Sequence, residues 1–376
     1  MMKLMKTLAG AALAVFMLAV PAQAQIKIGV FLPLTGQNAF GGQLELDGVN
    51  LAFQEIPEVL GQKVELVVGD NKSDQVEAAN VVTRLINRDK VVAIIGTYGS
   101  SLAMAGGKVA EAAKVPVVGT SCTNPLVTQG MTYYFRACFI DPYQGAGAAT
   151  YAVKNLGAKK AALLVDVSND YAVGLSAFFK RSFLKLGGEI VADLKYNSGD
   201  QDFTAQLTEI ISKQPDVVFI PAYFAEGGII MKQAKELGAK FRLMGGDAMD
   251  NPETITIAGN AAEGFVHTTF PYDPGMSDMN DQAKAFTAAW IKAYPGKDPN
   301  VNAALGYTSY VMILDAIQKG GAATPEAITK ALAATKDLAT PLGHLTLDED
   351  HNPAMPVGII EIKGGKRVYI GEVQPD

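Results

Sequence analysis

The feature that most constrains the fold is a regular alternation of short, apolar, β-branched runs with longer amphipathic stretches. In the first part of the chain the apolar runs occupy residues 26–32, 64–69, 91–96 and 115–119, and helical stretches occupy 42–56, 74–89 and 101–114. The run that begins at Val91 is apolar for five residues, which is typical of a parallel strand buried on both faces. This alternation predicts a parallel sheet covered by helices on both sides.

The alternation restarts after residue 140 and predicts a second α/β unit with its own sheet. Its apolar runs lie at 161–165, 189–196, 217–222 and 242–246, and its helical stretches at 144–156, 171–186, 202–213 and 226–238. A further run at 263–270 is followed by helical stretches at 278–293, 302–318 and 325–334. Residues 357–362 and 367–373 flank a Gly-rich turn and predict a β-hairpin.

The length of the chain also indicates two domains. At 376 residues it exceeds the size at which a single hydrophobic core stops growing, and its 49% hydrophobic residues suffice for two cores. Pro- and Gly-rich junctions lie at 141–142, 271–275 and near 352–356. We therefore predict two doubly wound, Rossmann-like lobes joined by a three-strand hinge. The N-terminal lobe comprises 25–140 plus 272–355, and the C-terminal lobe 141–271 plus 356–376. Ligands bind in such folds at the carboxyl ends of the strands.

The first residues predict a secretory signal peptide. Lys3 and Lys6 precede an uncharged apolar run at 8–20, and small residues follow at the positions that a signal peptidase requires. This run is too short to cross a bilayer. We expect cleavage after Ala24 and a periplasmic mature protein, and no cysteine follows the run to carry a lipid.

Composition and motifs argue against several functional classes. The net charge of −6, without a basic cluster, disfavours nucleic acid as a partner. Ser100 has no neighbouring histidine, and the sequence has no nucleophile elbow, Walker motif or dinucleotide fingerprint. His267, His344 and His351 lack metal-ligand spacing. We therefore expect no enzymatic activity, no cofactor and no metal.

The chain has two cysteines, Cys122 and Cys138. An oxidising compartment permits a disulfide between them, and two buried free thiols are the alternative.

Two strand ends of the first lobe are rich in hydroxyl residues. Residues 97–101 (Thr-Tyr-Gly-Ser-Ser) follow one predicted strand, and residues 120–125 (Thr-Ser-Cys-Thr-Asn-Pro) follow the next. A helix N-terminus with an adjacent hydroxyl can bind a carboxylate or phosphate. Plain helix capping is the alternative reading of such residues.

The strand ends of the second lobe offer complementary groups. Tyr171 and Tyr223 have apolar faces with a hydroxyl tip, which suits them to close over a small polar ligand. Asp247 follows two glycines in a tight turn. The alternatives are core tyrosines and a helix-capping aspartate. An anion site in one lobe and a carboxylate in the other would together match a zwitterion.

Several short motifs, in their order along the chain, carry a family resemblance. They are residues 28–36 (Ile-Gly-Val-Phe-Leu-Pro-Leu-Thr-Gly), 95–96 with 100–101, 123–125, 135–136 with 141 and 144–145, 245–247 and 304–307. With these the chain resembles the leucine/isoleucine/valine-binding proteins of branched-chain amino acid ABC transporters, which have the type I periplasmic-binding fold. The resemblance covers essentially all of residues 25–376.

The resemblance implies a role for each matching position. The Ser100 hydroxyl and the Thr123 N–H would bind the ligand α-carboxylate, and the Ser121 carbonyl and Thr123 hydroxyl would accept from the α-ammonium. Asp247 would be the acidic partner of the ammonium. Tyr171 and Tyr223 would cover the ligand. The full predicted binding set is Phe40, Tyr98, Ser100, Ser101, Ser121, Thr123, Tyr171, Tyr223, Asp247 and Met249.

Three positions depart from the family pattern and affect the side-chain pocket. Phe40-Gly41-Gly42 stands where many relatives have a tyrosine, Met249 replaces an aromatic residue, and Ala304 replaces a bulky one. These changes predict a roomier pocket.

The resemblance implies a monomer that delivers a small amino acid, most often branched-chain, to a membrane permease. The alternatives are an aromatic or polar amino acid, a carboxylate or an amide as ligand, or a role as a periplasmic sensor.

Overall fold

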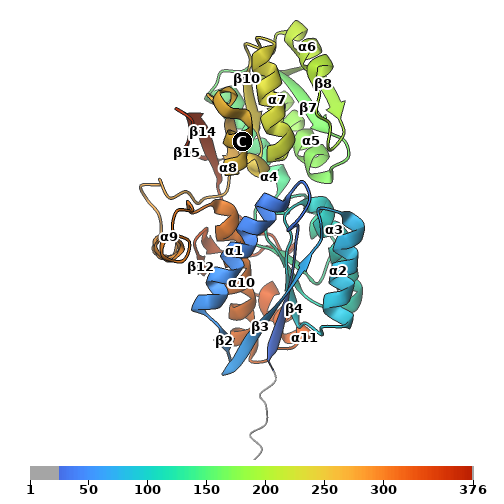
Figure 1. The fold of residues 1–376 in the computed structure, drawn as a ribbon, viewed down its shortest axis with the longest axis vertical. Coiled ribbons are helices and arrows are strands. Elements are labelled where there is room, and N and C mark those ends of the chain that lie inside the picture. The colour runs from blue at the N-terminus through green and yellow to red at the C-terminus, as the bar shows by residue number, and fades with distance from the viewer. Residues whose placement is uncertain (1–24, 375–376) are drawn as a thin grey trace, which may run out of the picture.

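The computed structural model describes residues 25–374, so the predicted signal peptide and its cleavage site lie outside the described residues. The described chain forms two α/β lobes, as predicted, and Figure 1 shows them stacked end to end. Within this range no helix has the length and apolar character needed to cross a membrane.

The first lobe is built on a six-stranded sheet in the order β2-β3-β1-β4-β5-β6, parallel except for β2. The strands are β1 (Ile26–Leu32), β2 (Glu58–Val59), β3 (Gln62–Asp70), β4 (Ala93–Ile95), β5 (Val117–Gly119) and β6 (Tyr134–Arg136). The helices of this lobe are α1 (Ala39–Glu55), α2 (Gln75–Asn87), α3 (Ser100–Ala113), α9 (Asp281–Ala293), α10 (Val301–Gly320) and α11 (Pro325–Ala333). A small pair, β12 (Leu338–Thr340) and β13 (Gly343–Leu345), packs beside α9 and α10.

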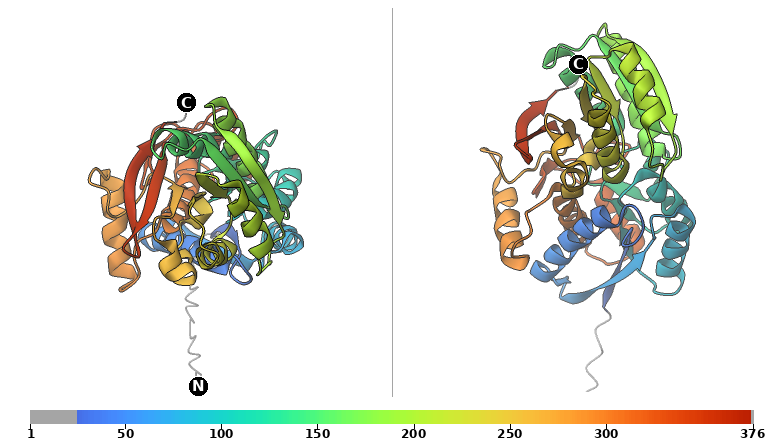
Figure 2. Two further views of the ribbon diagram at one scale, coloured as in Figure 1. Left: turned by 90° about the horizontal axis from the view of Figure 1, so that it is seen from above. Right: turned by 45° about the horizontal axis from the view of Figure 1, so that its top comes forward.

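The second lobe is built on a seven-stranded sheet in the order β15-β14-β11-β10-β9-β7-β8. The strands are β7 (Lys160–Asp166), β8 (Glu189–Tyr196), β9 (Val217–Ile220), β10 (Arg242–Gly245), β11 (Val266–Thr269), β14 (Val357–Lys363) and β15 (Lys366–Val373). The helices are α4 (Asp141–Lys154), α5 (Asp170–Lys185), α6 (Thr204–Lys213), α7 (Phe224–Glu236) and α8 (Pro252–Ala258). The predicted hairpin is the antiparallel pair β14–β15, which forms one edge of this sheet, opposite β8 (Figure 2).

The central strand β1 shows why the alternation of apolar runs and helical stretches gives a lobe of three layers, with a sheet between two layers of helices. Ile28 and Val30 lie in the apolar cluster formed with α1 and α10, and Phe31 lies in the cluster formed with α2 and α3. Alternate side chains of a strand point to opposite faces, so both faces of the sheet must be apolar. In the second lobe, α4 and α5 cover one face, and α6, α7 and α8 cover the other.

Helix starts follow local capping chemistry. The side chains of Asp74, Asn169 and Asn300 accept backbone N–H groups at the first turns of α2, α5 and α10. Such caps satisfy N–H groups that have no partner within the helix. The pattern did not predict α8 or the short strands β2, β12 and β13, because elements of two to seven residues carry too little periodicity.

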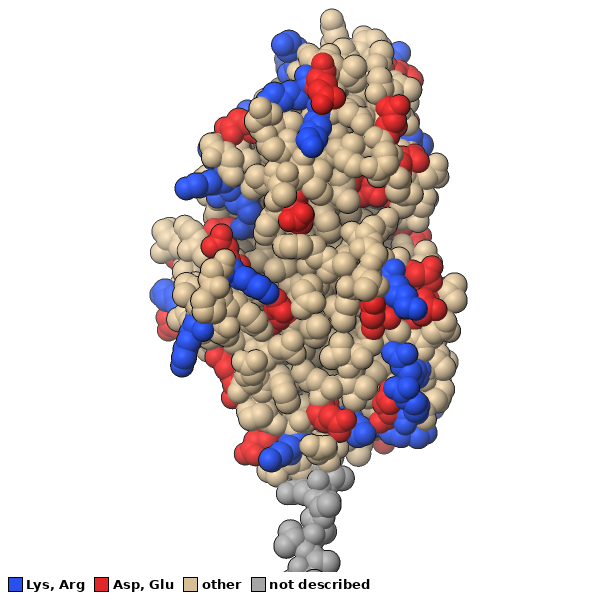
Figure 3. Space-filling model, in the orientation of Figure 1, with Lys and Arg blue, Asp and Glu red and all other residues tan. Residues whose placement is uncertain are grey.

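The chain passes between the sheets three times, after β6, after β11 and after β13. The predicted lobe boundaries at 140/141, 271/272 and 355/356 fall in these three connections, and as exact limits they remain our proposal. Charged side chains of both signs are interspersed on the face shown in Figure 3.

Helices α1 and α10 approach each other through glycine. A Cβ atom on Gly48 would lie 1.9 Å from the carbonyl oxygen of Ala303. This distance is far below van der Waals contact, so the two helices can keep their separation only without a side chain at this position.

We predict that Gly48→Ala lowers the free energy of unfolding by about 3 kcal/mol or more, since overpacking forces the helices apart. Guanidinium-induced unfolding measures this change. Gly320→Ala, at the end of α10, is the matched control, because its Cβ would lie 3.1 Å from the nearest atom. A change within about 1 kcal/mol is expected there, and equal effects of the two substitutions would contradict the prediction.

Candidate functional site

The carboxyl-end loops of the two sheets face each other, and the first lobe contributes hydroxyl groups. Ser100 begins α3 directly after the β4 loop, and its side chain is 1% exposed. The N–H of Asn124 donates to Ser100 Oγ over 3.1 Å, which leaves the hydroxyl proton of Ser100 available. Thr123 lies in the neighbouring loop after β5, and its buried Oγ1 has no hydrogen-bond partner. The first lobe therefore presents unused hydrogen-bonding capacity at a helix N-terminus.

The second lobe contributes carboxyl groups. The Tyr171 hydroxyl donates to Asp247 Oδ1 over 2.9 Å, and the Asp247 N–H donates to Gln144 Oε1 over 2.9 Å. Burial raises the pKa of Asp247 to about 6. Burial and the nearby Asp247 also raise the pKa of Asp141, whose Oδ2 has no hydrogen-bond partner. Carboxyl groups held in this way are prepared to meet a positive charge.

Three tyrosines form a continuous wall across the interface. The ring centroids of Tyr98 and Tyr223 lie 5.6 Å apart, and those of Tyr171 and Tyr223 also lie 5.6 Å apart. The Tyr98 hydroxyl donates to the Ala248 carbonyl of the opposite lobe over 3.3 Å. A Cβ atom on Gly41 would lie 2.7 Å from the Tyr98 ring, so this ring occupies the space that the missing side chain leaves. The predicted widening of the pocket at 40–42 is therefore offset by Tyr98.

Direct contacts between the lobes show that the structure is a closed form. The Asp170 N–H donates to Ser101 Oγ over 3.1 Å, and the Asn124 side-chain amide donates to the Asp170 carbonyl over 2.8 Å. At the other side of the interface, the Asn302 amide donates to the Asp250 carbonyl over 3.0 Å. Ser101 thus bonds across the lobe interface, and its contact with a ligand stays a prediction.

Phe40 and Met249 lie apart from the other predicted residues. Phe40 is 39% exposed, and its ring lies 6.5 Å from that of Phe224. Met249 is buried in the apolar cluster between the second sheet and α7, where its sulfur would lie 2.4 Å from a Cβ atom on Gly227. The remaining eight predicted residues are all at most 8% exposed and lie on loops that follow the strands, or on the helices these loops lead into.

Sequence reasoning gave no site role to Glu45, Asp141 or Gln144. Asp141 and Gln144 lie on the first turn of α4, directly after a lobe crossing, and Gln144 joins Asp141 to Asp247 by hydrogen bonds. Glu45 lies on α1, and its carboxylate accepts from the hydroxyls of Thr120 and Ser121. Only the position of Asp141 and Gln144 in a family motif pointed to them, and nothing in the sequence distinguished Glu45 from a solvent-facing helix residue.

Among the described residues, no group of His, Cys, Asp and Glu side chains has the arrangement of a metal site. His267 lies buried against the backbone, where its ring contacts the Thr268 carbonyl over 3.0 Å, and burial lowers its pKa. No hydrogen bond joins it to Ser100, whose Oγ accepts from the Asn124 N–H. The site residues therefore offer binding contacts and no paired nucleophile and base.

The two cysteines are both fully buried and unbridged. They contact each other behind the β5 loop, where burial and the neighbouring Cys122 raise the pKa of the Cys138 thiol. Of the two possibilities that the sequence left open, the structure contains the free thiols.

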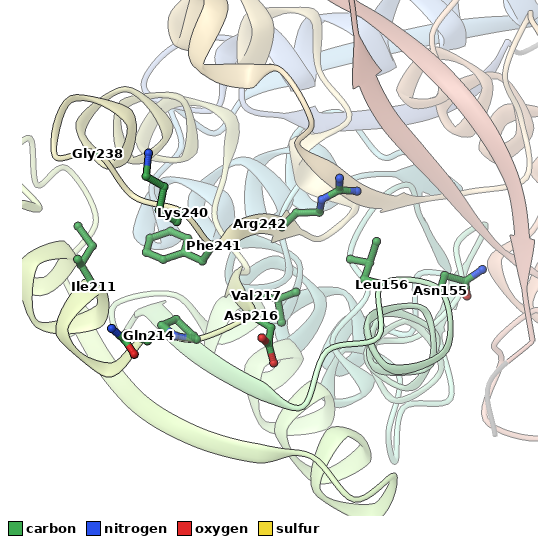
Figure 4. Close-up of a pocket in the computed structure, with 11 residues that line it drawn as sticks. Asn155, Leu156, Ile211, Gln214, Asp216, Val217, Gly238, Lys240, Phe241 and Arg242 are labelled. Atoms are coloured by element: carbon green, nitrogen blue, oxygen red, sulfur yellow. The ribbon is translucent and has the colours of Figure 1, made fainter.

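A hollow of about 820 Å³ lies at the other end of the second sheet (Figure 4). It is lined by residues at the amino ends of β9 and β10, such as Val217 and Arg242. The Asp216 carboxylate there accepts from the N–H groups of Lys159 and Lys160, each over 2.8 Å. The Asp216 carboxylate is therefore used within the protein. Ligands of parallel sheets bind at the opposite, carboxyl edge of the sheet, so we do not assign the hollow as the ligand site.

Comparison with known proteins places the chain among solute-binding proteins. The sequence profile of the periplasmic binding protein family matches residues 25–366. A Leu/Ile/Val-binding protein of Rhizobium johnstonii is 32% identical over 92% of this chain and 93% of its own length. The crystal structure of a leucine binding protein from Thermotoga maritima is 41% identical, with a TM-score of 0.90 over 93% of this chain and 99% of that one. An ABC transporter solute binding protein of R. palustris in complex with benzoate is 27% identical, with a TM-score of 0.85 over 94% and 97%.

We predict that the native protein does not react with Ellman's reagent, because both thiols are buried. The same protein in guanidinium should release two equivalents of thiolate per chain. Protein that has first been reduced and freed of reductant is the control for full reactivity. Absence of thiols in the denatured, unreduced sample would show a disulfide and contradict the structure.

Proposed function

Because the chain belongs to the periplasmic binding protein family, we propose that it captures an α-amino acid with a branched aliphatic side chain between its lobes and delivers it to the permease of an ABC transporter. Its relatives are solute-binding proteins, and this chain is likewise a binding protein and not an enzyme. The family implies a location in the periplasm or outside the cell. Export by the predicted signal peptide, with cleavage after Ala24, belongs to the proposal.

The observation that carries the proposal is a set of buried polar groups on the two sides of one closed interface whose hydrogen-bonding capacity is not fully used. Thr123 Oγ1 in the first lobe and Asp141 Oδ2 in the second are buried close to each other, where burial raises the pKa of Asp141 and the Thr123 side chain opposes this rise, and neither atom makes a hydrogen bond of good geometry. Buried polar atoms are almost always hydrogen-bonded, so unsatisfied ones at an interface indicate a missing ligand. An α-amino acid carries an anionic and a cationic group on one carbon and can satisfy both lobes at once.

The proposed contacts follow from the orientation of each group. The Ser100 hydroxyl and the N-terminus of α3 bind the carboxylate, since Ser100 Oγ accepts from the Asn124 N–H and keeps its proton to donate, and the first N–H groups of a helix point outward. The Ser121 carbonyl, Thr123 Oγ1 and the Asp247 carboxylate accept from the ammonium. Tyr171 and Tyr223 lie beside Asp247 and cover the ligand with their apolar faces.

Two arguments support a ligand with an aliphatic side chain. The rings of Tyr98, Tyr171 and Tyr223 place apolar faces at the lobe interface, and relatives that cover almost the whole chain are named for leucine, isoleucine and valine. The benzoate complex of a more distant relative favours one alternative, a carboxylate without an amine. Aromatic or polar amino acids, amides and a sensor role are further alternatives within the same fold.

The proposed mechanism is a shift between open and closed populations. A ligand that contacts both lobes stabilises only the closed form, in which the contacts of Asp170 and Asn302 are made. The closed protein, as a monomer, would then dock on the permease.

We predict that branched-chain amino acids raise the melting temperature of protein that has been unfolded and refolded to remove bound ligand. At a hundredfold excess over Kd the stabilisation is about 2.7 kcal/mol, and differential scanning fluorimetry detects it. The panel includes aromatic and polar amino acids, benzoate and 4-methylpentanoate. A shift with carboxylates alone would overturn the amino-acid assignment.

We predict that Ser100→Ala and Asp247→Asn each weaken binding of the stabilising amino acid at least about tenfold, since each loses a charge-assisted hydrogen bond. Isothermal titration calorimetry measures the affinity. Ser309→Ala and Asp315→Asn on α10 are matched controls, because Ser309 bonds only its own helix and Asp315 pairs with Lys319. Unchanged affinity in the two site variants would remove these residues from the site.

A further inference from the structure

Glu45 is a buried carboxyl group to which the proposed function gives no role. It lies on α1 with its side chain fully buried, and burial raises its pKa to about 8. Thr120 Oγ1 donates to Glu45 Oε2 over 2.6 Å, and Ser121 Oγ donates to Glu45 Oε1. None of the ion pairs between residues 25 and 374 includes Glu45.

Hydrogen bonds from two hydroxyls satisfy the Glu45 oxygens but supply no opposite charge. Burying a carboxyl group without a cation is costly in its ionised form. A second acidic residue on the same helix shows the ordinary arrangement. Asp47 is nearly buried, but it pairs with Lys297 over 3.0 Å and accepts from Gln43. Glu45 differs because its only partners are hydroxyls of the ligand-binding loop.

Three buried carboxyl groups of the closed interface lack an ion-pair partner among the described residues. Glu45, Asp141 and Asp247 are all buried, and the electrostatic repulsion of Asp247 adds to the raised pKa of each of the other two. The nearest buried cation, Arg136, directs its guanidinium to the Cys122 and Asn124 carbonyls and to Thr128 Oγ1. In the described part of the chain, no cation pairs with any of the three carboxyl groups. A ligand that carries a positive charge would therefore favour the ionised forms of these carboxyl groups.

We propose that Glu45 is a positioning residue that acts through Ser121 to make the cavity select ligands with an ammonium group over carboxylates that lack one. This inference rests on the proposed function. When Glu45 is ionised, the Ser121 hydroxyl donates its proton to it, so the Ser121 Oγ lone pairs and carbonyl can only accept hydrogen bonds. An ammonium donates to these acceptors. A second carboxylate in the place of the ammonium would add negative charge beside these acceptors. An aromatic ring in that place would leave the acceptors without a hydrogen bond.

The test compares leucine with 4-methylpentanoate, which is leucine without its amine, and with benzoate. Calorimetry on wild type and on Glu45→Gln gives the ratio of affinities for leucine and the amine-free acid. The glutamine amide can donate to Ser121 and free its hydroxyl proton for a carboxylate. We expect this ratio to fall about tenfold or more in Glu45→Gln. Asp47→Asn, two residues away on the same helix, should leave the ratio unchanged.

A pH series separates this role from a structural one. The titratable groups that face Glu45 are Cys122 in the loop after β5, Tyr98 before α3 and Asp247 across the interface, and Gly306 of α10 packs against the Glu45 backbone. An ammonium favours ionised carboxyl groups, so leucine affinity in wild type should begin to fall as the pH drops below about 8. In Glu45→Gln the fall should begin only near pH 6, where Asp247 is protonated.

The outcomes distinguish the two proposals. Suppose that wild type prefers leucine, and that Glu45→Gln shows the same ratio of affinities for leucine and 4-methylpentanoate and the same dependence of leucine affinity on pH. The proposed role of Glu45 is then overturned. Equal losses for leucine and 4-methylpentanoate in a folded variant also overturn it, because they indicate a structural effect. If wild type itself prefers 4-methylpentanoate or benzoate to leucine, the proposed function fails instead.

Discussion

The carboxyl ends of the parallel strands in the two sheets face each other, and this constraint places every polar group of the candidate site. Parallel strands all end at the same edge of a sheet, so the loops after β4 and β5 lie side by side in the first lobe. The loops after β7, β9 and β10 do the same in the second. The loops lead into helices whose N-termini point toward the interface, so backbone N–H groups and capping side chains gather where the lobes meet.

The same constraint explains why closure depends on a ligand. When the lobes close, carboxyl groups such as Asp141 and Asp247 lose water and gain few protein partners. The direct bonds between the lobes, such as those of Asp170 and Asn302, involve neutral groups and contribute about 1 kcal/mol each. They offset little of the desolvation cost of the carboxyl groups. A ligand that brings the missing charge changes this balance, and only such differential stabilisation can shift the population toward the closed form.

The sequence predicted the fold and most strand-end residues because both depend on local signals. Apolar runs identify buried parallel strands, and hydroxyl or acidic residues directly after them must lie at the carboxyl edge. The rest depends on contacts that are distant in sequence. Glu45 meets Ser121 across 76 positions, and the Tyr98 ring fills the space above Gly41. The direction of Met249 into the second core, away from the interface, is set by packing against Gly227, which no local pattern encodes.

Relatives of this chain are named for branched-chain amino acids, and one was crystallised with benzoate, so the fold alone does not select the ligand class. The carboxylate is common to both classes, and the hydroxyl and N–H groups at the start of α3 suit it in either case. Selection must therefore come from the groups that face the rest of the ligand. In the proposed site those groups are acidic on both sides of the interface, Asp247 in one lobe and Glu45 behind Ser121 in the other. Acidic groups at the interface repel a carboxylate ligand that has no amine. The ammonium group of a zwitterion instead offsets the cost of removing these acidic groups from water when the lobes close.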